Sequence, residues 1–189
     1  MNVSFKEVYP CAENVQPLLI GAEIPEAGLR RSNGSPCELA ELIKTKPSII
    51  IFYRGGWWRF CIEQLSQLEE IKDQIDALGY QLIMISPDSP DKIKETIDSH
   101  QFSHLFLSDS KAAAAIAFGI AFQVDAETLE MFAEYGVDLN AASGEIHHIL
   151  PVPAVFILRA AGTINFEYVN PDFTERLKPD VLLAAAKAG

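Results

Sequence analysis

Hydrophobic residues along the chain fall into two kinds of pattern, and the first is the short unbroken run. Such runs occupy 48–53, 80–86 and 104–109, where branched apolar residues follow one another without polar alternation. This pattern is typical of strands that are covered on both faces. Two later runs, 154–159 and 164–169, are separated by a short turn and predict a β-hairpin.

The second pattern is a recurrence of apolar residues at steps of three and four, which predicts helices. The longest such helix is expected over 59–78, and Gly79 is placed to end it in a left-handed conformation. Its apolar stripe consists of Ile62, Leu65, Leu68, Ile71, Ile75 and Leu78. Further helices are expected at 37–44, 91–100, 111–119, 126–136 and 179–188, with a loop over 137–145.

Strands and helices therefore alternate, and a hairpin and a helix follow them. Alternation with buried strands predicts an α/β fold with a parallel sheet and helices on both faces, to which the hairpin adds an antiparallel part. The order β-α-β-α-β-α-β-β-α is the plan of a thioredoxin-like fold with an extra strand and helix in its middle. Prolines break 1–37 into irregular chain, although Asn33-Gly34 predicts a hairpin turn within 30–36.

Length and composition limit the organisation and the partners of the molecule. The chain has 189 residues, of which 49% are hydrophobic, which suits one core and a single domain over 1–189, with 1–16 as a possible N-terminal extension. A net charge of −11 argues against nucleic acid and anionic membranes as partners. We find neither a secretory signal nor an apolar run of about eighteen residues, and we expect a cytoplasmic protein.

The cysteine and histidine residues do not indicate a structural metal or a disulfide framework. Cys11, Cys37 and Cys61 are odd in number and widely spaced, and no two are close enough to form a zinc clip. His147 and His148 are adjacent, so on a strand they would point to opposite faces. We therefore expect neither a bound metal nor a cofactor.

The stretch FYRGGWWRFC at 52–61 is the candidate for chemistry, because Cys61 stands where a buried strand gives way to a helix. Ligands of such sheets bind beyond the carboxyl ends of the strands. Unpaired N–H groups and the helix dipole favour a thiolate in the first turn, and Arg54 and Arg59 could add positive charge. The residues alone leave two interpretations open, a reactive thiolate or a buried cysteine that packs as a small apolar side chain.

This stretch resembles the strand-to-helix motif of the alkyl hydroperoxide reductase and thiol-specific antioxidant (AhpC/TSA, peroxiredoxin) family. It is especially similar to a peroxiredoxin-like branch that carries Arg-Gly-Gly-Trp-Cys-Pro-x-Cys there. The resemblance covers roughly 17–188 and includes SNGSPCELAELI before the first buried strand and LPVPAVFILRAAGTINFEYVNPDFTERL near the end. It implies a thioredoxin-like fold, with a central mixed sheet and the insertion typical of peroxiredoxins.

The resemblance implies that Cys61 is the cysteine that attacks peroxide. Trp57 matches the aromatic residue of the branch's motif, and Arg54 matches its arginine. Other positions of this sequence differ from the motif. Trp58 stands where the branch has cysteine and ordinary peroxiredoxins have threonine. Arg59 replaces the branch's proline, and the family's distal arginine falls at or near Pro153.

These departures remove groups with chemical roles. The family's threonine hydroxyl holds the peroxide, whereas a tryptophan offers one N–H donor and no acceptor. An alternative interpretation of Trp57 and Trp58 is that they are large side chains that pack on the sheet and cover the start of the helix. The segment VPAV resembles the thioredoxin-fold segment with a cis proline, which predicts a cis Val152–Pro153 bond beside Cys61; an ordinary trans proline at a strand start is the alternative.

The resemblance implies a thiol-dependent peroxidase whose substrate is a hydroperoxide. One subgroup of the family keeps a second thiol five residues after the first, but Ser66 occupies that position here. A one-cysteine cycle with an external thiol, glutathione or a thioredoxin-type protein, is therefore expected, in a chain that could form a homodimer. The alternatives are a non-catalytic binding or regulatory domain that has lost the redox pair, and thiol–disulfide exchange.

Overall fold

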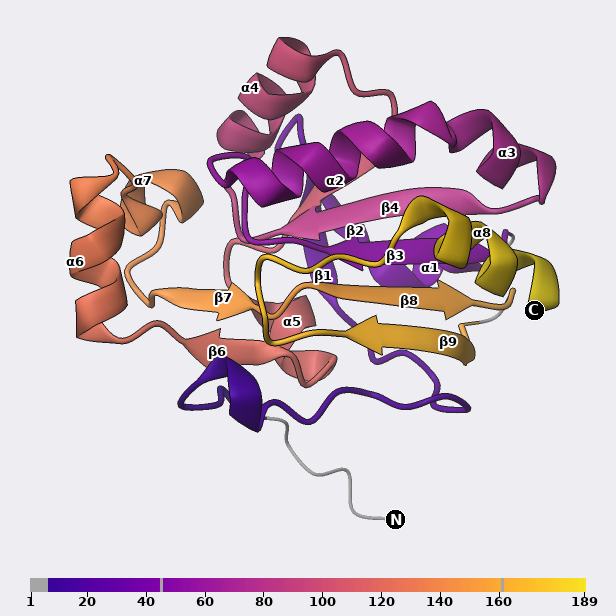
Figure 1. Ribbon diagram of the computed structural model, residues 1–189, viewed down its shortest axis with the longest axis horizontal. Coiled ribbons are helices and arrows are strands. Elements are labelled where there is room, and N and C mark those ends of the chain that lie inside the picture. Colours follow the sequence, from indigo (N-terminus) through magenta and orange to yellow (C-terminus); the bar gives the residue numbers. More distant parts are fainter. Residues whose placement is uncertain (1–6, 45, 161) are drawn as a thin grey trace.

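A seven-stranded mixed sheet forms the centre of the molecule, as shown by a computed structural model that describes residues 7–44, 46–160 and 162–189 (Figure 1). Its strands lie in the order β2-β1-β5-β4-β3-β8-β9. They are β1 (Gly28–Arg31), β2 (Pro36–Glu38), β3 (Ser48–Phe52), β4 (Gln81–Ser86), β5 (Leu105–Ser108), β8 (Ala154–Leu158) and β9 (Ile164–Val169). The helices are η1 (Ala12–Asn14), α1 (Leu39–Ile43), α2 (Arg59–Glu70), α3 (Lys72–Ala77), α4 (Pro90–His100), α5 (Ala113–Ala117), α6 (Ala126–Glu134), α7 (Leu139–Ser143) and α8 (Pro179–Ala188).

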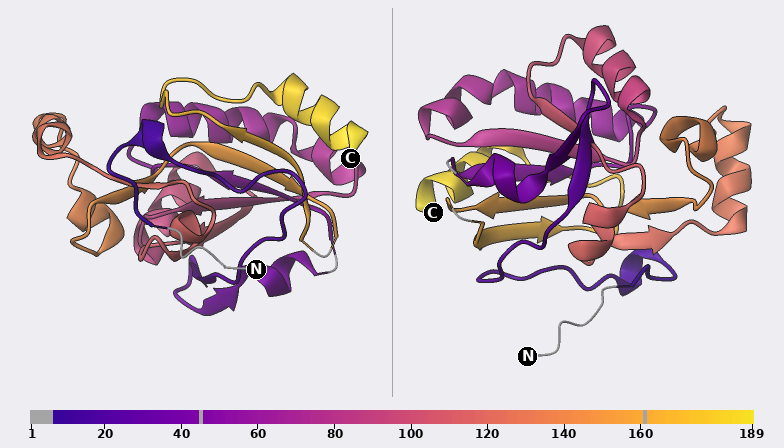
Figure 2. Two further views of the ribbon diagram at one scale, coloured as in Figure 1. Left: turned by 90° about the horizontal axis from the view of Figure 1, so that it is seen from below. Right: turned by 180° about the vertical axis from the view of Figure 1, so that it is seen from behind.

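The sheet combines parallel and antiparallel pairing, as the sequence predicts. β3, β4 and β5 are parallel neighbours, whereas β8 pairs antiparallel with β3, and β9 with β8. Helices α2, α3 and α8 lie on one face, and α1 and α5 lie on the other (Figures 1 and 2). This is the expected thioredoxin-like arrangement.

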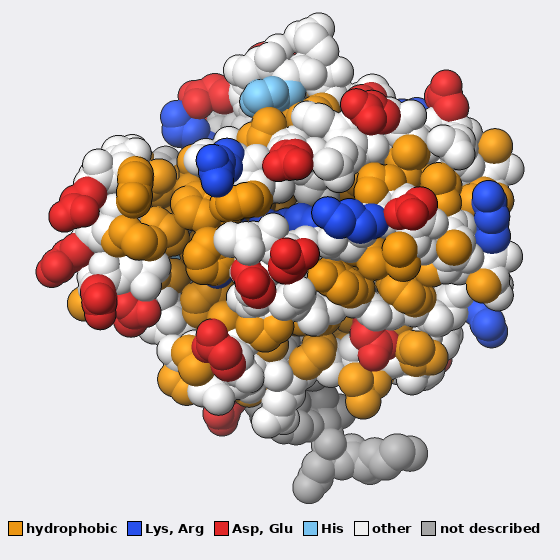
Figure 3. All heavy atoms as spheres, viewed as in Figure 1, with side chains coloured by type: hydrophobic (Ala, Val, Ile, Leu, Met, Phe, Trp, Pro, Cys, Tyr) orange, Lys and Arg blue, Asp and Glu red, His pale blue; other side chains and the backbone are white. Residues whose placement is uncertain are grey.

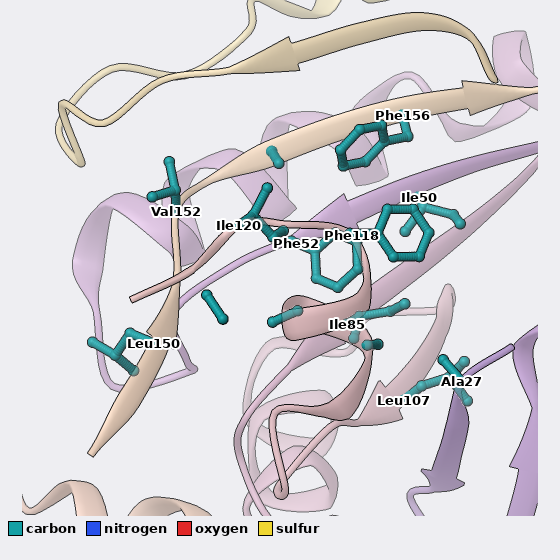
Figure 4. Close-up of a cluster of buried hydrophobic side chains, with 14 of the residues drawn as sticks. Ala27, Ile50, Phe52, Ile85, Leu107, Phe118, Ile120, Leu150, Val152 and Phe156 are labelled. Carbon is teal, nitrogen blue, oxygen red and sulfur yellow. The ribbon is translucent and has the colours of Figure 1, made fainter. Parts of the chain in front are cut away.

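Strand β3 shows why helices cover both faces. Ile49 and Ile51 pack with the apolar side of α2, α3 and α8, while Ile50 and Phe52 pack with α1 and α5. Successive side chains of a strand point to opposite faces, so an unbroken apolar strand supplies two cores. On the second face the rings of Phe52, Phe118 and Phe156 meet in one cluster (Figure 4).

Some predicted element bounds are wrong. The helix expected over 59–78 is interrupted at Ile71, whose backbone angles of φ −101° and ψ 4° separate α2 from α3. The stretch 137–145, expected as a loop, contains α7, whose first turn Asp138 caps through its side chain. The stretch 1–37, expected to be irregular, contains β1 and the start of β2, although the hairpin turn at Asn33-Gly34 is confirmed, with Gly34 at φ +81°.

A smaller sheet extends the molecule beyond the carboxyl ends of the central strands. β6 (Ala121–Gln123) pairs with β7 (Ile149–Pro151), and α6 and α7 connect them as a lobe at one end of the molecule (Figure 1). Within the predicted N-terminal extension, Tyr9 forms a β-bridge with Phe122, while 1–6 lie outside the described residues. None of the helices in the described part of the chain is long and apolar enough to cross a membrane.

Candidate active site

The turn that follows β3 places the start of α2 beside the sheet. Gly55 has φ +154°, and a Cβ there would lie 2.1 Å from the Trp57 indole nitrogen, so only glycine fits. The Gly56 N–H donates to Asp88 Oδ2 at 2.7 Å, which ties this turn to the chain after β4. Helix α2 then begins with Trp58 as its N-cap residue.

Cys61 occupies the first turn of α2, as the sequence predicts. Its N–H donates to the Trp58 carbonyl oxygen at 2.9 Å, and its side chain is 0% exposed within the cluster that includes Leu65 and Tyr53. The position offers helix-terminus N–H groups to a thiolate. The complete burial means that a substrate can reach the sulfur only after neighbouring side chains move.

Arg176 contacts the sulfur, and sequence reasoning missed it. Its Nη2 lies 3.5 Å from Cys61 Sγ, and its Nη1 donates to the carbonyl oxygens of Phe173 and Glu175. These carbonyls hold the guanidinium in place, so a charged donor is positioned against the sulfur. The only signal in the sequence was its location in the NPDFTERL stretch that resembles the family, 115 residues after Cys61.

Arg54 is a second cation near Cys61, and it is almost completely buried. Its side chain is 4% exposed, and its guanidinium lies over the rings of Phe173 at 4.4 Å and Phe122 at 5.4 Å. Burial lowers the pKa of Arg54 to about 10; the positive charge of Arg176 acts in the same direction, and a charge on Cys61 would oppose it. Arg54 therefore remains a cation at neutral pH.

The other predicted site residues lie around this group without joining it. Arg59 is exposed, and its guanidinium covers the Phe60 ring at 4.5 Å. Trp57 and Trp58 are half-buried and pack edge-on against each other and against Phe132, with centroid distances of 5.4 to 5.9 Å. Both tryptophans therefore cover the helix start, as the packing interpretation expected.

The predicted cis bond before Pro153 is wrong, because the described residues contain no cis peptide bond. Val152 donates its N–H to the Ile120 carbonyl oxygen at 2.8 Å, and the chain passes extended from β7 into β8. A trans proline at the start of a strand needs no hydrogen bond from its nitrogen and is well tolerated there. The predicted supporting role of Pro153 therefore rests on the resemblance.

Buried polar groups next to the site have shifted pKa values. Burial raises the pKa of Asp88 to about 7, although the Gly56 N–H and the Trp57 indole favour its carboxylate form. Burial, together with the charges of Asp88 and Cys61, also raises the pKa of Tyr53 well above its ordinary value. The interior around Asp88 and Tyr53, next to Cys61, is therefore poorly solvated.

Cys11 and Cys37 are both free thiols and are partly exposed. Burial raises the pKa of Cys37, which makes its thiolate scarce at neutral pH. The Cys11 thiol donates to Asn14 Oδ1 at 2.9 Å at the start of η1. In the described ranges, no group of three or more His, Cys, Asp or Glu side chains is arranged to hold a metal ion.

The chain has a mixed thioredoxin-like sheet, and it has a cysteine in the first turn of the helix that follows the central strand. Together these two features define a class of thioredoxin-fold proteins with a cysteine at this helix start. The AhpC/TSA family model matches residues 20–167, and the chain belongs to that family. A Haemophilus influenzae protein named as peroxiredoxin bcp is 28% identical over 106 residues, which are 56% of this chain and 68% of that protein.

Solved structures show the same fold. Reduced Prx3 from Vibrio vulnificus superimposes with a TM-score of 0.74 at 16% identity, covering 90% of this chain and 99% of that one. A peroxiredoxin-like protein from Aquifex aeolicus gives 0.72 at 20% identity, covering 92% and 88%. Peroxidoxin BcpB from Mycobacterium tuberculosis gives 0.69 at 16% identity, covering 89% and 96%.

Proposed function

We propose that the protein is a thiol-dependent peroxidase of the cytoplasm in which Cys61 reduces hydroperoxides. The observation that carries this proposal is the Arg176 guanidinium, 3.5 Å from the Cys61 sulfur at the start of α2, with Arg54 as a second nearby cation. Two guanidinium groups and a helix N-terminus favour a thiolate, which is the attacking species.

The reaction begins with attack of the Cys61 thiolate on one oxygen of the hydroperoxide. An S–O bond forms, the O–O bond breaks, and the alcohol leaves after it takes up a proton, so that Cys61 becomes a sulfenic acid. Arg176 is placed to stabilise the charge that develops on the leaving oxygen. This assigns to Arg176 the part of the distal arginine, whose family position falls at or near Pro153.

The cycle closes with an external thiol. A first thiol attacks the sulfenic acid, forms a mixed disulfide and releases water; a second thiol then releases Cys61 and leaves as the oxidised disulfide. Ser66 occupies the family's second cysteine position, so the helix supplies no resolving thiol.

The test is peroxide consumption with glutathione or a thioredoxin system as reductant. The unmodified chain is expected to consume hydrogen peroxide, and Cys61→Ser is expected to stop this, while Cys37→Ser serves as the matched control and stays active. Equal consumption by the unmodified chain and Cys61→Ser would overturn the proposal.

One observation favours a second candidate, a non-catalytic binding or regulatory domain. The Cys61 side chain is 0% exposed in a cluster against which Trp58 packs, and Trp58 occupies the position of the branch's other cysteine, three residues before Cys61. If Cys61 does not react with peroxide in the folded protein, this candidate takes the place of the enzyme.

A further inference from the structure

A pocket of about 520 Å³ lies beside the site, between η1, β6, the start of α6 and the chain that precedes α8. Its walls include the aromatic rings of Phe122, Phe132 and Phe173 and the buried guanidinium of Arg54. This volume falls in the range of about 300 to 1,000 Å³ that small-molecule sites occupy. The space-filling view shows hydrophobic side chains beside acidic ones over α6, whose start forms part of the pocket wall (Figure 3).

Arg54 supplies this pocket with a cation that has no carboxylate partner among the residues that the structure describes. Its Nε is buried without a hydrogen-bond partner, and the charged groups that affect its pKa are Cys61 and Arg176. A buried guanidinium with unused donors in a pocket wall is suited to a carboxylate, with which it can form paired hydrogen bonds.

The pocket also has an acidic side. Glu13, Asp125 and Asp172 contribute to its walls. Hydrogen bonds from the Thr128 N–H and hydroxyl lower the pKa of Asp125, and those from the Thr174 hydroxyl and N–H lower the pKa of Asp172, so both remain negative. These acids would repel a purely anionic ligand, whereas a ligand that carries an ammonium group as well as a carboxylate matches both sides.

Phe173 connects the pocket to the reacting sulfur. Its ring lies under the Arg54 guanidinium in the pocket wall, and its carbonyl oxygen accepts from Arg176, which contacts Cys61 Sγ. A ligand anchored at Arg54 is therefore linked to the thiol through Phe173 and Arg176. A concave pocket beside a fully buried sulfur suits a small molecule better than the surface of a protein reductant.

We infer that this pocket binds the reductant, and that the reductant is a small thiol derived from an amino acid, with its carboxylate at Arg54 and its ammonium group toward Glu13, Asp125 and Asp172. This rests on the proposed function and specifies its second half. The bound thiol attacks the Cys61 sulfenic acid, forming the S–S bond and releasing water. A second molecule of the same thiol then reduces the mixed disulfide and restores the Cys61 thiolate.

Binding is measured by calorimetry with S-methylglutathione, whose blocked sulfur cannot exchange. Two analogues of about the same size separate the charges: N-glutaryl-S-methylcysteinylglycine lacks the ammonium group, and the diamide of S-methylglutathione lacks both carboxylates. S-methylglutathione is expected to bind at least about tenfold more tightly than either, because charge-assisted hydrogen bonds form at both ends. No measurable binding, or equal binding of all three probes, would overturn the inference.

Variants test the two sides of the pocket. Arg54→Gln is expected to weaken S-methylglutathione binding about tenfold or more, and the exposed Glu13→Gln about threefold, since each removes one charged partner. Arg59→Gln is the matched control, because it removes a nearby arginine, at the start of α2, that lies outside the pocket, and it is expected to leave binding unchanged. If neither Arg54→Gln nor Glu13→Gln changes binding, the inference is wrong.

The failure of this inference is distinguishable from that of the proposed function. Stoichiometric oxidation of Cys61 by hydrogen peroxide needs no reductant, and it is followed by mass spectrometry on the same samples. Oxidation without S-methylglutathione binding refutes the pocket assignment alone. Binding without oxidation refutes the peroxidase, and with it the role of the bound thiol as reductant.

Discussion

At the scale of single residues, the contact between Arg176 and the Cys61 sulfur makes the sharpest prediction. Arg176→Met is expected to slow the reaction of Cys61 with hydrogen peroxide about a hundredfold, which is the usual cost of losing one preorganised donor. The second-order rate constant is measured by stopped-flow tryptophan fluorescence. Arg59→Met is the control, because its exposed guanidinium covers Phe60 instead; a similar loss in both variants would contradict the assignment.

Trp58 bears on both chemistry and packing. Trp58→Cys would restore the spacing of the branch's cysteine pair. The new thiol would lie at the N-cap of α2, about one helical turn before Cys61, and we expect a disulfide between the two cysteines after peroxide treatment. The indole packs against Phe60, Phe132 and Phe173, so its loss is expected to cost on the order of a few kcal/mol. Peptide mapping and urea unfolding measure the two effects, and a free Cys61 after oxidation would refute the pairing.

Asp88 gives a prediction for the dependence of stability on pH. Its pKa is raised from 3.8 to about 7 in the folded protein, so between these pH values the native state retains a proton that the unfolded chain releases. Compared with that of Asp88→Asn, the free energy of unfolding of the unmodified chain is therefore expected to fall by a few kcal/mol as the pH rises from 4 to 7. Above pH 7 the difference between the two proteins is expected to stay constant, because Asp88 is then ionised in both the folded and the unfolded state. Urea unfolding at pH 4, 5.5 and 8 tests this, and parallel curves would contradict it.

At the scale of elements, the loop between β3 and α2 depends on a close approach to α4. A Cβ at Gly56 would lie 2.0 Å from Thr96 Oγ1, so Gly56→Ala is expected to destabilise the protein by about 1 to 3 kcal/mol through overpacking. Thr96→Ala removes that hydroxyl and should recover part of the loss in the double variant. A double-mutant cycle by thermal unfolding measures the coupling, and strictly additive effects would rule out this contact as the cause.

At the scale of the whole molecule, the reactivity of Cys61 is expected to depend on the complete fold. Arg176 reaches the sulfur across 115 residues of chain, and unfolding separates them. As urea increases, the rate of Cys61 oxidation by peroxide should fall to that of an ordinary cysteine in the same transition as the circular dichroism signal. A rate that stays high in the unfolded chain would show that local sequence, and not tertiary structure, activates the thiol.

The sequence alone determined the architecture and the place of the candidate nucleophile. Unbroken apolar runs identified the strands, and their alternation with helices predicted the mixed sheet, because a strand with two apolar faces must be covered twice. The position of Cys61 at the start of a helix followed from the same local pattern. Segments such as β6 and β7 escaped detection because a strand of three residues is too short for its pattern to be read.

Only the tertiary structure decided which side chains surround the sulfur. Of the two arginines near Cys61 in sequence, it directed Arg54 into the interior and Arg59 to the surface, and it brought Arg176 to Cys61 from the segment before α8. The sequence pattern could not show this, because the direction of a loop side chain depends on contacts with distant elements. The pocket beside Arg54 arose in the same way, since η1, β6, α6 and the chain before α8 meet only in the folded molecule.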